Sequence, residues 1–185
     1  MIKEAVQDSE RRMHSAIKSL QDDLAGIRTG RANPGLVEKL SIEYYGAPAP
    51  LMQLATISVP EPRQLLIKPF DAGSIKDIDR AIQSSDLGLT PINDGKVIRL
   101  NLPVLTEERR RELSKFVNNR LEEARVAVRN VRRDTIKDMR EFENEKLISE
   151  DDLKRGEEDI QKLTDKVIEE ITSIGSEKEK EIMEI

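Results

Sequence analysis

Apolar residues recur every three or four positions along a long central stretch, residues 106–146. The positions are Leu113, Val117, Leu121, Ala124, Val128, Val131, Thr135, Met139, Phe142 and Lys146, where Thr135 and Lys146 keep the spacing without being apolar. This is the spacing of one helical face, and no Pro or Gly interrupts it. A helix of this length would extend roughly 60 Å, well beyond the average globular helix. Such a helix needs long partners to cover its apolar face.

Both ends of the chain show a related spacing. Residues 1–29 repeat apolar positions in steps of three and four, and residues 149–185 keep a seven-residue register at Leu153, Ile160, Val167 and Ile174. Ser149 begins a helix-capping sequence ahead of that register. We therefore predict an elongated antiparallel bundle of three helices over 1–29, 106–146 and 149–185. Gly156 and Gly175 are expected to weaken the last helix by about 1 kcal/mol each relative to Ala.

The stretch between the first two helices has a different character. Its alternating or short apolar runs predict β-strands, at residues 37–45, 54–59, 64–68 and 96–102. Residues 46–50 are typical of a turn or extended loop, and Asn93-Asp94-Gly95 of a hairpin turn. A capping box at Ser74–Asp77 predicts the start of a short helix. The fold class is α+β, a three-helix bundle with a small inserted β/α/β domain.

The expected domain boundaries follow from these elements. The bundle comprises residues 1–29 and 106–185, and the inserted domain comprises residues 30–105. Hinge linkers are expected at 30–35 and 102–105, where the hinge residues are Gly30, Pro34, Gly35, Pro103 and Leu105. Gly and Pro at these points end the regular structure. Because little apolar sequence remains to join the two domains, we expect them to move relative to each other.

The inventory of reactive residues argues against an enzyme. The chain has no Cys and one His, and it lacks glycine motifs for nucleotide binding. We therefore expect no catalytic residues, no metal site, no cofactor and no small-molecule substrate. The absence of Cys suits a reducing cytoplasm, and no apolar run approaches the length of a membrane span. We expect a cytoplasmic monomer that does not contact membranes.

Charge is distributed unevenly along the chain. Residues 106–133 contain nine Lys or Arg and five Asp or Glu, a net charge of +4, whereas residues 134–185 contain nine and eighteen. At 100° per residue, Arg125, Arg129 and Arg132 lie together beside the apolar face. We call these three residues the arginine stripe; Arg111, Lys115, Arg133 and Arg140 lie further round the helix. Charged helical faces are commonly only solvated, but a local cationic band within an acidic protein favours an anionic partner.

Six motifs, in order along the chain, resemble the ribosome recycling factor family. They are Arg28-Thr29-Gly30-Arg31-Ala32, Glu43-Tyr44-Tyr45-Gly46, Ser85-Asp86-Leu87-Gly88-Leu89, Leu105-Thr106-Glu107-Glu108-Arg109-Arg110, the segment from Arg125 to Asp134, and Gln161-Lys162-Leu163-Thr164-Asp165. The resemblance runs from end to end, without a departure in the basic motifs. It implies a three-helix domain joined by a hinge to a β/α/β domain, in an L shape of roughly transfer-RNA size.

The resemblance also implies a function. Members bind the post-termination ribosome and split it into subunits together with elongation factor G and GTP. By motif, Arg129 and Arg132 should contact large-subunit ribosomal RNA. The full set of expected RNA-binding residues is Arg28, Arg31, Arg110, Arg125, Arg129, Arg132 and Arg133. Arginine suits this role because its planar guanidinium reaches phosphates with two donors. With few aromatic residues, recognition of the RNA backbone and shape is expected.

Two other interpretations can be weighed against RNA binding. A coiled-coil adapter that binds a helical protein would explain the seven-residue register and the acidic third helix, but not the concentration of Arg in 109–133. A hydrolase in the inserted domain has no residues to carry the reaction. A steep dependence of ribosome binding on salt would favour the RNA interpretation over the adapter.

Overall fold

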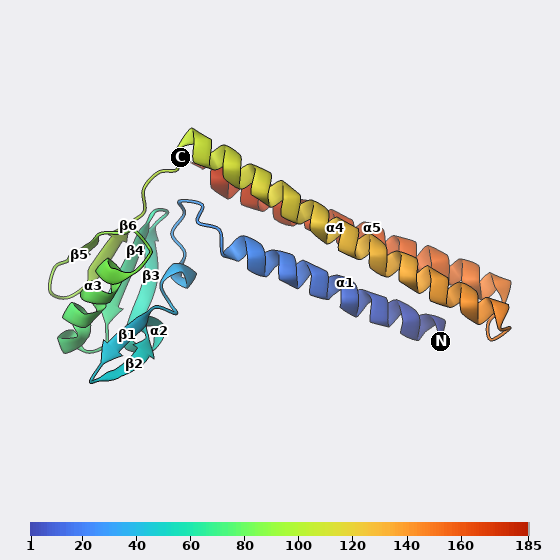
Figure 1. The fold of residues 1–185 in the computed structure, drawn as a ribbon, viewed down its shortest axis with the longest axis horizontal. Helices are drawn as coiled ribbons and strands as arrows, with labels where there is room; N and C mark the ends of the chain where they lie inside the picture. The colour runs from blue at the N-terminus through green and yellow to red at the C-terminus, as the bar shows by residue number, and fades with distance from the viewer. Residues whose placement is uncertain (185) are drawn as a thin grey trace. The chain divides into compact units, whose positions relative to one another are not determined.

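The computed structural model describes residues 1–184 and divides into two compact units (Figure 1). The helical unit comprises Met1–Ile27 and Glu107–Glu184, and the small unit comprises Arg28–Thr106. The structure is mixed helix and sheet, with long helices in a bundle and a small β-containing unit. The predicted α+β fold class is therefore confirmed.

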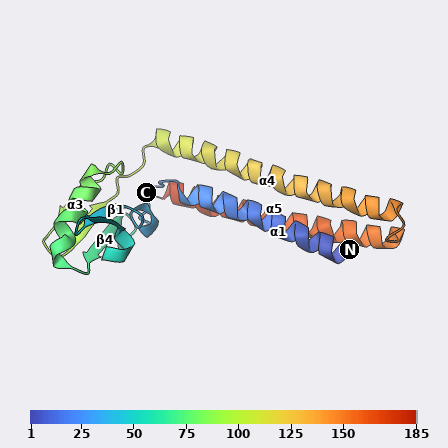
Figure 2. The ribbon, with the colours of Figure 1, turned by 60° about the horizontal axis from the view of Figure 1, so that its bottom comes forward.

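Three long helices build the helical unit: α1 (Ile2–Ala25), α4 (Glu107–Asn144) and α5 (Glu150–Met183). Helices α4 and α5 run side by side in opposite directions, and α1 packs on both (Figure 2). Their apolar positions form a continuous buried seam that includes Met13, Val128, Ile160 and Ile171. Seven of the eight buried residues of α4 are apolar and the other is Thr135, which is what the spacing of three and four predicts.

The helix ends differ from the predicted ones. Helix α1 stops at Ala25 rather than residue 29, because Gly26 follows and the chain then turns into the small unit. Helix α4 ends at Asn144 rather than 146, where Lys146 adopts a left-handed conformation with φ of 61°. Ser149 caps α5 in a reciprocal capping box with Asp152, as the sequence predicted.

The two glycines of α5 have a packing role that the sequence analysis missed. Both are buried. A Cβ added at Gly175 would overlap the Leu121 side chain of α4, and one added at Gly156 would lie 2.9 Å from the Sδ atom of Met139. The absence of a side chain therefore lets α4 approach α5 closely at both positions. The helix-weakening effect predicted for these glycines is only part of their contribution.

The small unit contains two sheets. Strands β1 (Ser41–Tyr44) and β2 (Ala47–Pro50) form an antiparallel hairpin. The other sheet is antiparallel in the order β3-β4-β6-β5. Its strands are β3 (Ala55–Glu61), β4 (Gln64–Pro69), β6 (Ile98–Asn101) and β5 (Pro91–Asn93). The core is aliphatic, with Ile42, Ile67 and Ile98 fully buried.

Helices complete the small unit. They are α2 (Leu51–Leu54) and α3 (Ile75–Ser84), with short 3-10 helices η1 (Pro34–Leu36) and η2 (Ala72–Ser74). Helix α3 turns Ile75, Ile78 and Ile82 into the core. Its predicted capping box at Ser74 was wrong, because the Ser74 hydroxyl donates to the Asp71 carbonyl and caps no amide of α3. The carboxylate of Asp71 instead accepts from the Gly73 amide in η2.

Other predictions for the small unit were also incomplete. The segment predicted as a turn or loop at 46–50 includes strand β2, whose prolines Pro48 and Pro50 lie on a sheet edge. The first strand begins at Ser41 instead of residue 37, since η1 and a turn occupy the preceding residues. Helix α2 and strand β5 were not predicted. The turn at Asn93-Asp94-Gly95 does join β5 to β6, with φ of 89° at Gly95.

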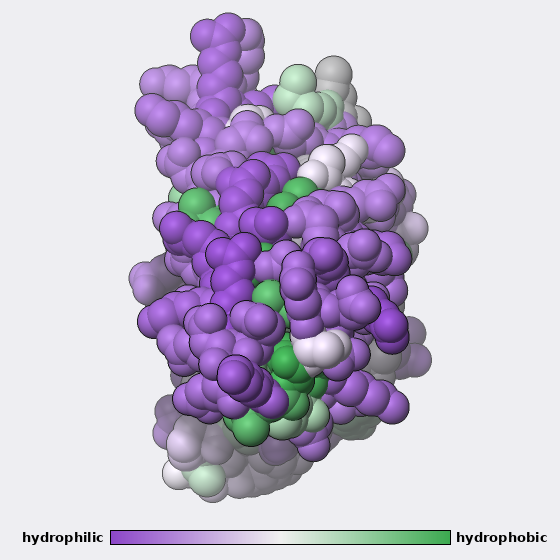
Figure 3. Space-filling model, turned by 90° about the vertical axis from the view of Figure 1, so that its right-hand side faces the viewer, coloured by the Kyte–Doolittle hydropathy of each residue, from purple (hydrophilic) through white to green (hydrophobic). Residues whose placement is uncertain are grey.

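The surface of the helical unit is strongly polar. Figure 3 views the right-hand side of Figure 1 and shows mainly hydrophilic residues around a narrow apolar area. Exposed apolar side chains of this unit include Met1, Leu147, Phe116 and Val126. Within residues 1–184, no helix has the length and hydrophobicity needed to cross a membrane.

Candidate nucleic-acid interface

The middle of α4 presents ten consecutive residues without a carboxylate. Residues 124–133 contain four arginines and no Asp or Glu. The apolar members Ala124, Val128 and Val131 are buried in the bundle. The helical period therefore places the arginines outside this buried face, which gives the segment a net positive charge at the surface.

The acidic residues directly next to this segment, Glu123 and Asp134, pair with cations outside it. Glu123 pairs with Arg120, which also pairs with Asp23 of α1. At the other end, Asp134 accepts from Arg12 of α1 at 2.9 Å. Because these carboxylates already face other cations, they neutralise the four arginines only weakly. The cationic character of residues 124–133 is thus preserved in the fold.

Two residues of the arginine stripe share one carboxylate. The Nη1 atom of Arg129 donates to Oε1 of Glu122 at 3.2 Å, across two helical turns. The Nη1 atom of Arg125 lies 3.6 Å from Oε2 of the same residue. Arg125 also donates through Nη2 to the Thr172 hydroxyl of α5 at 3.2 Å. Arg125 is thus held between two helices, whereas Arg129 remains half exposed.

Arg132 and its neighbour Arg133 have no carboxylate within ion-pair distance in the described part of the chain. The sequence explains this, since no acidic residue stands three or four positions away from either one. Arg133 donates to the Asn130 side chain. The Nε atom of Arg132 is buried and makes no hydrogen bond within the protein. These two guanidinium groups carry the least compensated charge of the segment.

The other predicted RNA-binding residues lie elsewhere. Arg28 and Arg31 belong to the small unit, and Arg110 lies in the first turns of α4. Arg28 donates to the Leu87 carbonyl at 2.9 Å, so part of its guanidinium stabilises the 85–89 loop. Arg31 is exposed, and the Nε atom of Arg110 is buried without a hydrogen bond. The structure thus groups four of the seven arginines in the middle of α4.

The two predicted hinge linkers touch each other within the small unit. Gly30 has φ of 80°, and a Cβ there would lie 3.4 Å from the Leu105 side chain and 3.5 Å from the Pro103 carbonyl. Both linkers are tied to the turn between β3 and β4, because the Ala32 amide donates to Pro62 and the Leu102 amide to Arg63. Pro34 and Gly35 lie beyond that tie, in η1.

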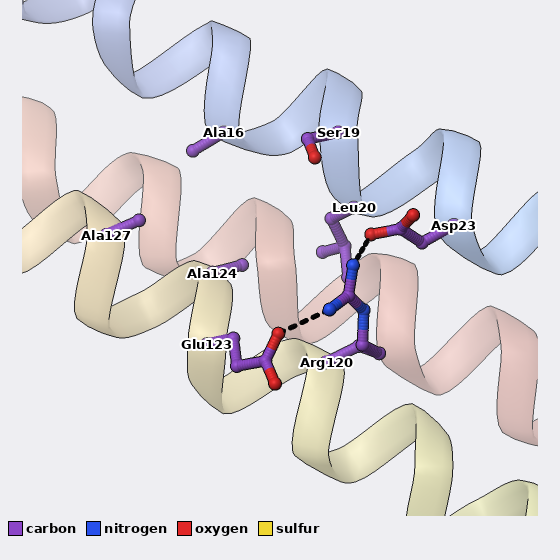
Figure 4. Close-up of a pocket in the computed structure, with 8 residues that line it drawn as sticks. All are labelled: Ala16, Ser19, Leu20, Asp23, Arg120, Glu123, Ala124 and Ala127. Atoms are coloured by element: carbon purple, nitrogen blue, oxygen red, sulfur yellow. Dashed lines mark hydrogen bonds and ion pairs between the residues drawn. The ribbon is translucent and has the colours of Figure 1, made fainter.

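A shallow hollow of about 200 Å³ lies between α1 and α4 (Figure 4). Its lining combines small side chains, including Ala16, Ala124 and Ala127, with the ion pairs of Arg120. Ser19 is its one hydroxyl, and no His lines it. Among residues 1–184, no group of three or more potential metal ligands is positioned to hold an ion. The arginines of α4 are therefore the strongest candidate site.

Comparison with known proteins identifies the family. The family model described as "Ribosome recycling factor" matches residues 20–183. The chain belongs to the ribosome recycling factor family. It is 57% identical to the ribosome-recycling factor of Halalkalibacterium halodurans over 185 residues, covering all of both chains. The family resemblance seen in the six motifs is thereby confirmed.

Solved structures of the family agree with the fold. A solution structure of the ribosome recycling factor has a TM-score of 0.77 at 46% identity, covering 100% of this chain and 98% of the other. The T. thermophilus ribosome recycling factor, in a structure with E. coli elongation factor G bound to the E. coli post-termination complex, has a TM-score of 0.67 at 43% identity. Both chains are fully covered in this second comparison.

Sequence reasoning missed two members of the site. Glu122 was counted only as one of five acids, although it stands three residues before Arg125; its pairing with Arg129 spans seven residues and falls outside the usual three- or four-residue spacing. Thr172 lies on another helix, and its contact with Arg125 depends on how α4 and α5 pack. The position of Glu122 on the same side of α4 as Arg125 and Arg129 was a signal that could have found the first.

Proposed function

We propose that this protein binds the post-termination ribosome through the arginines of α4 and, with elongation factor G and GTP, splits the ribosome into subunits. Family membership supports the class of function, and the T. thermophilus relative is described, together with E. coli elongation factor G, in models bound to the E. coli post-termination complex. The observation that carries the proposal is the acid-free segment 124–133, whose two adjacent carboxylates, Glu123 and Asp134, pair with Arg120 and Arg12.

Recognition of the phosphate backbone follows from the side chains available. Guanidinium groups bind phosphate oxygens with two parallel donors and remain charged at any physiological pH. The segment contains no aromatic side chain for base stacking. We therefore propose that α4 recognises the backbone and shape of large-subunit ribosomal RNA, with Arg132 and Arg133 as its strongest contacts.

A hinge role for the two linkers completes the proposal. Hydrogen bonds to the β3–β4 turn hold Ala32 and Leu102 in the small unit, and helices α1 and α4 begin the helical unit. Residues 26–31 and 103–106 are the segments between these fixed points. A few residues that change φ and ψ are sufficient for hinge motion. We propose that elongation factor G acts on the small unit while α4 remains bound to RNA, and that Gly30, Pro103 and Leu105 lie at the pivot.

Ribosome binding over a salt series tests the RNA contact. We expect Arg132→Ala to weaken binding by about tenfold or more and to reduce the slope of log affinity against log salt by roughly one. The melting temperature should hardly change, since Arg132 lies outside the apolar seam. Arg11→Ala is the matched control, because it removes an exposed cation of α1 that pairs locally with Asp8.

The outcome also separates RNA binding from a protein adapter. Binding that is insensitive to salt, and equal for the Arg132 and Arg11 variants, would contradict the RNA contact and support a helical protein partner. Early unfolding of Arg132→Ala with normal affinity for ribosomes would make Arg132 a structural residue instead.

A further inference from the structure

Glu122 is the only carboxylate that contacts the arginine stripe among the described residues. It reaches Arg125 at 3.6 Å and Arg129 at 3.2 Å, using a different carboxylate oxygen for each. Its side chain is more than half exposed, with 57% of its surface accessible. A carboxylate placed between two guanidinium groups occupies the position that a phosphate group would take on an arginine pair.

The adjacent acid has a different partner. Glu123 is similarly exposed, at 64%, but it turns toward Arg120 in the hollow between α1 and α4 (Figure 4). Arg120 is also held by Asp23. Two neighbouring glutamates of equal charge and similar exposure therefore differ in their partners, since Glu122 contacts the arginine stripe and Glu123 contacts Arg120.

We propose that Glu122 is an intramolecular competitor for RNA phosphate, which weakens the binding of the arginine stripe and speeds release of the protein. The inference rests on the proposed RNA contact of α4 and adds a specific residue that limits its affinity. Glu122 is a positioning residue in this account, since it acts through Arg125 and Arg129 and does not itself bind RNA.

The competition follows from charge and geometry. A phosphate that approaches Nη1 of Arg129 must displace the Glu122 oxygen now 3.2 Å away. The displaced carboxylate stays on the same helical face and repels the phosphate. Arg125 keeps its hydrogen bond to Thr172, which is uncharged and can persist in the complex. Arg132 lacks a carboxylate partner within the described residues, so this competition does not affect it.

The size of the effect is set by the exposure of the pair. Exposed ion pairs are weak, so removing the competitor should tighten binding by about twofold to fivefold. Most of the change should appear in the dissociation rate, as is usual for variants of a single interface. A factor that must leave the ribosome after each round gains faster release from such a residue.

The experiment compares Glu122→Gln with Glu123→Gln, using ribosomes and fluorescently labelled full-length protein. Gln keeps the size and helix propensity of Glu, so both variants should fold normally. We expect Glu122→Gln to tighten binding by about threefold and slow dissociation to a similar extent. Glu123→Gln should remain near the wild-type values, because Arg120 keeps Asp23 as its partner. In an Arg125→Ala/Arg129→Ala background most of the gain should disappear.

Each other outcome overturns part of the argument. Equal tightening by both variants would reflect net charge alone, and weaker binding by Glu122→Gln would mean that Glu122 preorganises the stripe; either result refutes competition. Arg132→Ala is measured in parallel. If it binds like wild type, the RNA contact of α4 and the inference about Glu122 both fail. If it binds weakly while Glu122→Gln and Glu123→Gln have equal affinity for ribosomes, only the inference fails.

Discussion

The helical unit and the small unit fill their interiors differently. In the helical unit, the buried positions include Gly156, Gly175 and hydroxyl residues, and the Ser9 and Thr135 hydroxyls meet between α1 and α4. In the small unit, the buried hydroxyls Thr29 and Ser74 lie in a linker and at the start of α3, and the core beneath the sheet is aliphatic, with six buried isoleucines. Small and polar residues at particular points along the helices prevent these long helices from sliding past one another. In the small unit, the pairing register of the strands already fixes the packing.

This difference bears on function. The three residues of the arginine stripe are separated by about one helical turn each, so a shift in helix register would move them relative to α5 and break the Arg125–Thr172 contact. Close contacts at the two glycines therefore help to fix the proposed RNA-binding surface. The contribution of the small unit in our proposal is mechanical.

The largest expected effect comes from deleting core volume in one unit. Ile67 of β4 is fully buried, and Ile67→Ala should lower the free energy of unfolding of the small unit by about 2–5 kcal/mol. Because each unit has its own core, the helices should keep their stability. Far-UV circular dichroism and amide hydrogen exchange in a urea series would report the two units separately.

The matched variant is Ile160→Ala, which removes an equally buried side chain from α5. It should destabilise the helices and leave exchange in β4 and β6 unchanged. One cooperative transition, shifted equally by both variants, would instead mean that the two units unfold as one and that the comparison of separate cores is wrong.

The next effect tests the close helix contacts. In Gly175→Ala the new methyl group would overlap Leu121, so overpacking should exceed the gain in helix propensity and lower stability by about 1–2 kcal/mol. Gly156→Ala should cost less than Gly175→Ala, because its nearest neighbours are the flexible thioether of Met139 at 2.9 Å and the Ile2 side chain at 3.1 Å. Urea unfolding of both variants measures the difference. Stabilisation by Gly175→Ala would show that the glycine only weakens α5.

A third effect concerns the linkers of the small unit. Gly30→Val places a branched side chain at φ of 80° and against Leu105. We expect subunit splitting driven by elongation factor G to fall about tenfold, roughly 1.4 kcal/mol on the barrier, while ribosome affinity stays within a few-fold. Rates of splitting can be followed by light scattering.

Gly46→Val is the control for this substitution. Gly46 has nearly the same φ, 79°, but no atom lies within 4 Å of its added Cβ. It introduces the same backbone strain in the β1–β2 turn, away from the linkers. Equal loss of splitting in both variants would attribute the defect to a destabilised small unit and remove the support for a pivot at Gly30.

How much the sequence predicted also differs between the two units. Over α4 and α5 the apolar spacing persists for many turns, so the predicted ends fell within two residues of the observed ones. In the small unit, β2 is four residues long and contains Pro48 and Pro50, which locally favour a turn. Only its pairing with β1 makes it a strand, and such pairing has no signal in a single sequence.

In the candidate site, too, features set by residues close in sequence could be predicted and contacts between distant segments could not. The arginines of α4 could be found from helical spacing and local charge, because both depend on residues close in sequence. The contact of Arg125 with Thr172 and the ties of Ala32 and Leu102 to the β3–β4 turn join segments that are distant in sequence. The sequence therefore predicted which cations lie together on α4, but not the partners that hold them.

The smallest expected effect concerns the capping box of α5 and its dependence on pH. Ser149→Ala removes the hydroxyl that accepts from the Asp152 amide at 3.1 Å, and should lower stability by about 1 kcal/mol. Hydrogen bonds from the Ser149 hydroxyl and amide also hold the pKa of Asp152 below its ordinary value. Since the folded-state pKa is the lower one, this contribution is present above the unfolded-state pKa of about 3.9 and is lost as pH falls through the folded value. Wild type should therefore lose more stability between about pH 5 and pH 2 than Asp152→Asn does. Asp151→Asn removes the same charge from the same helical turn but takes no part in the box, so it should keep the wild-type profile; an identical loss in all three proteins, measured by urea unfolding, would refute the coupling.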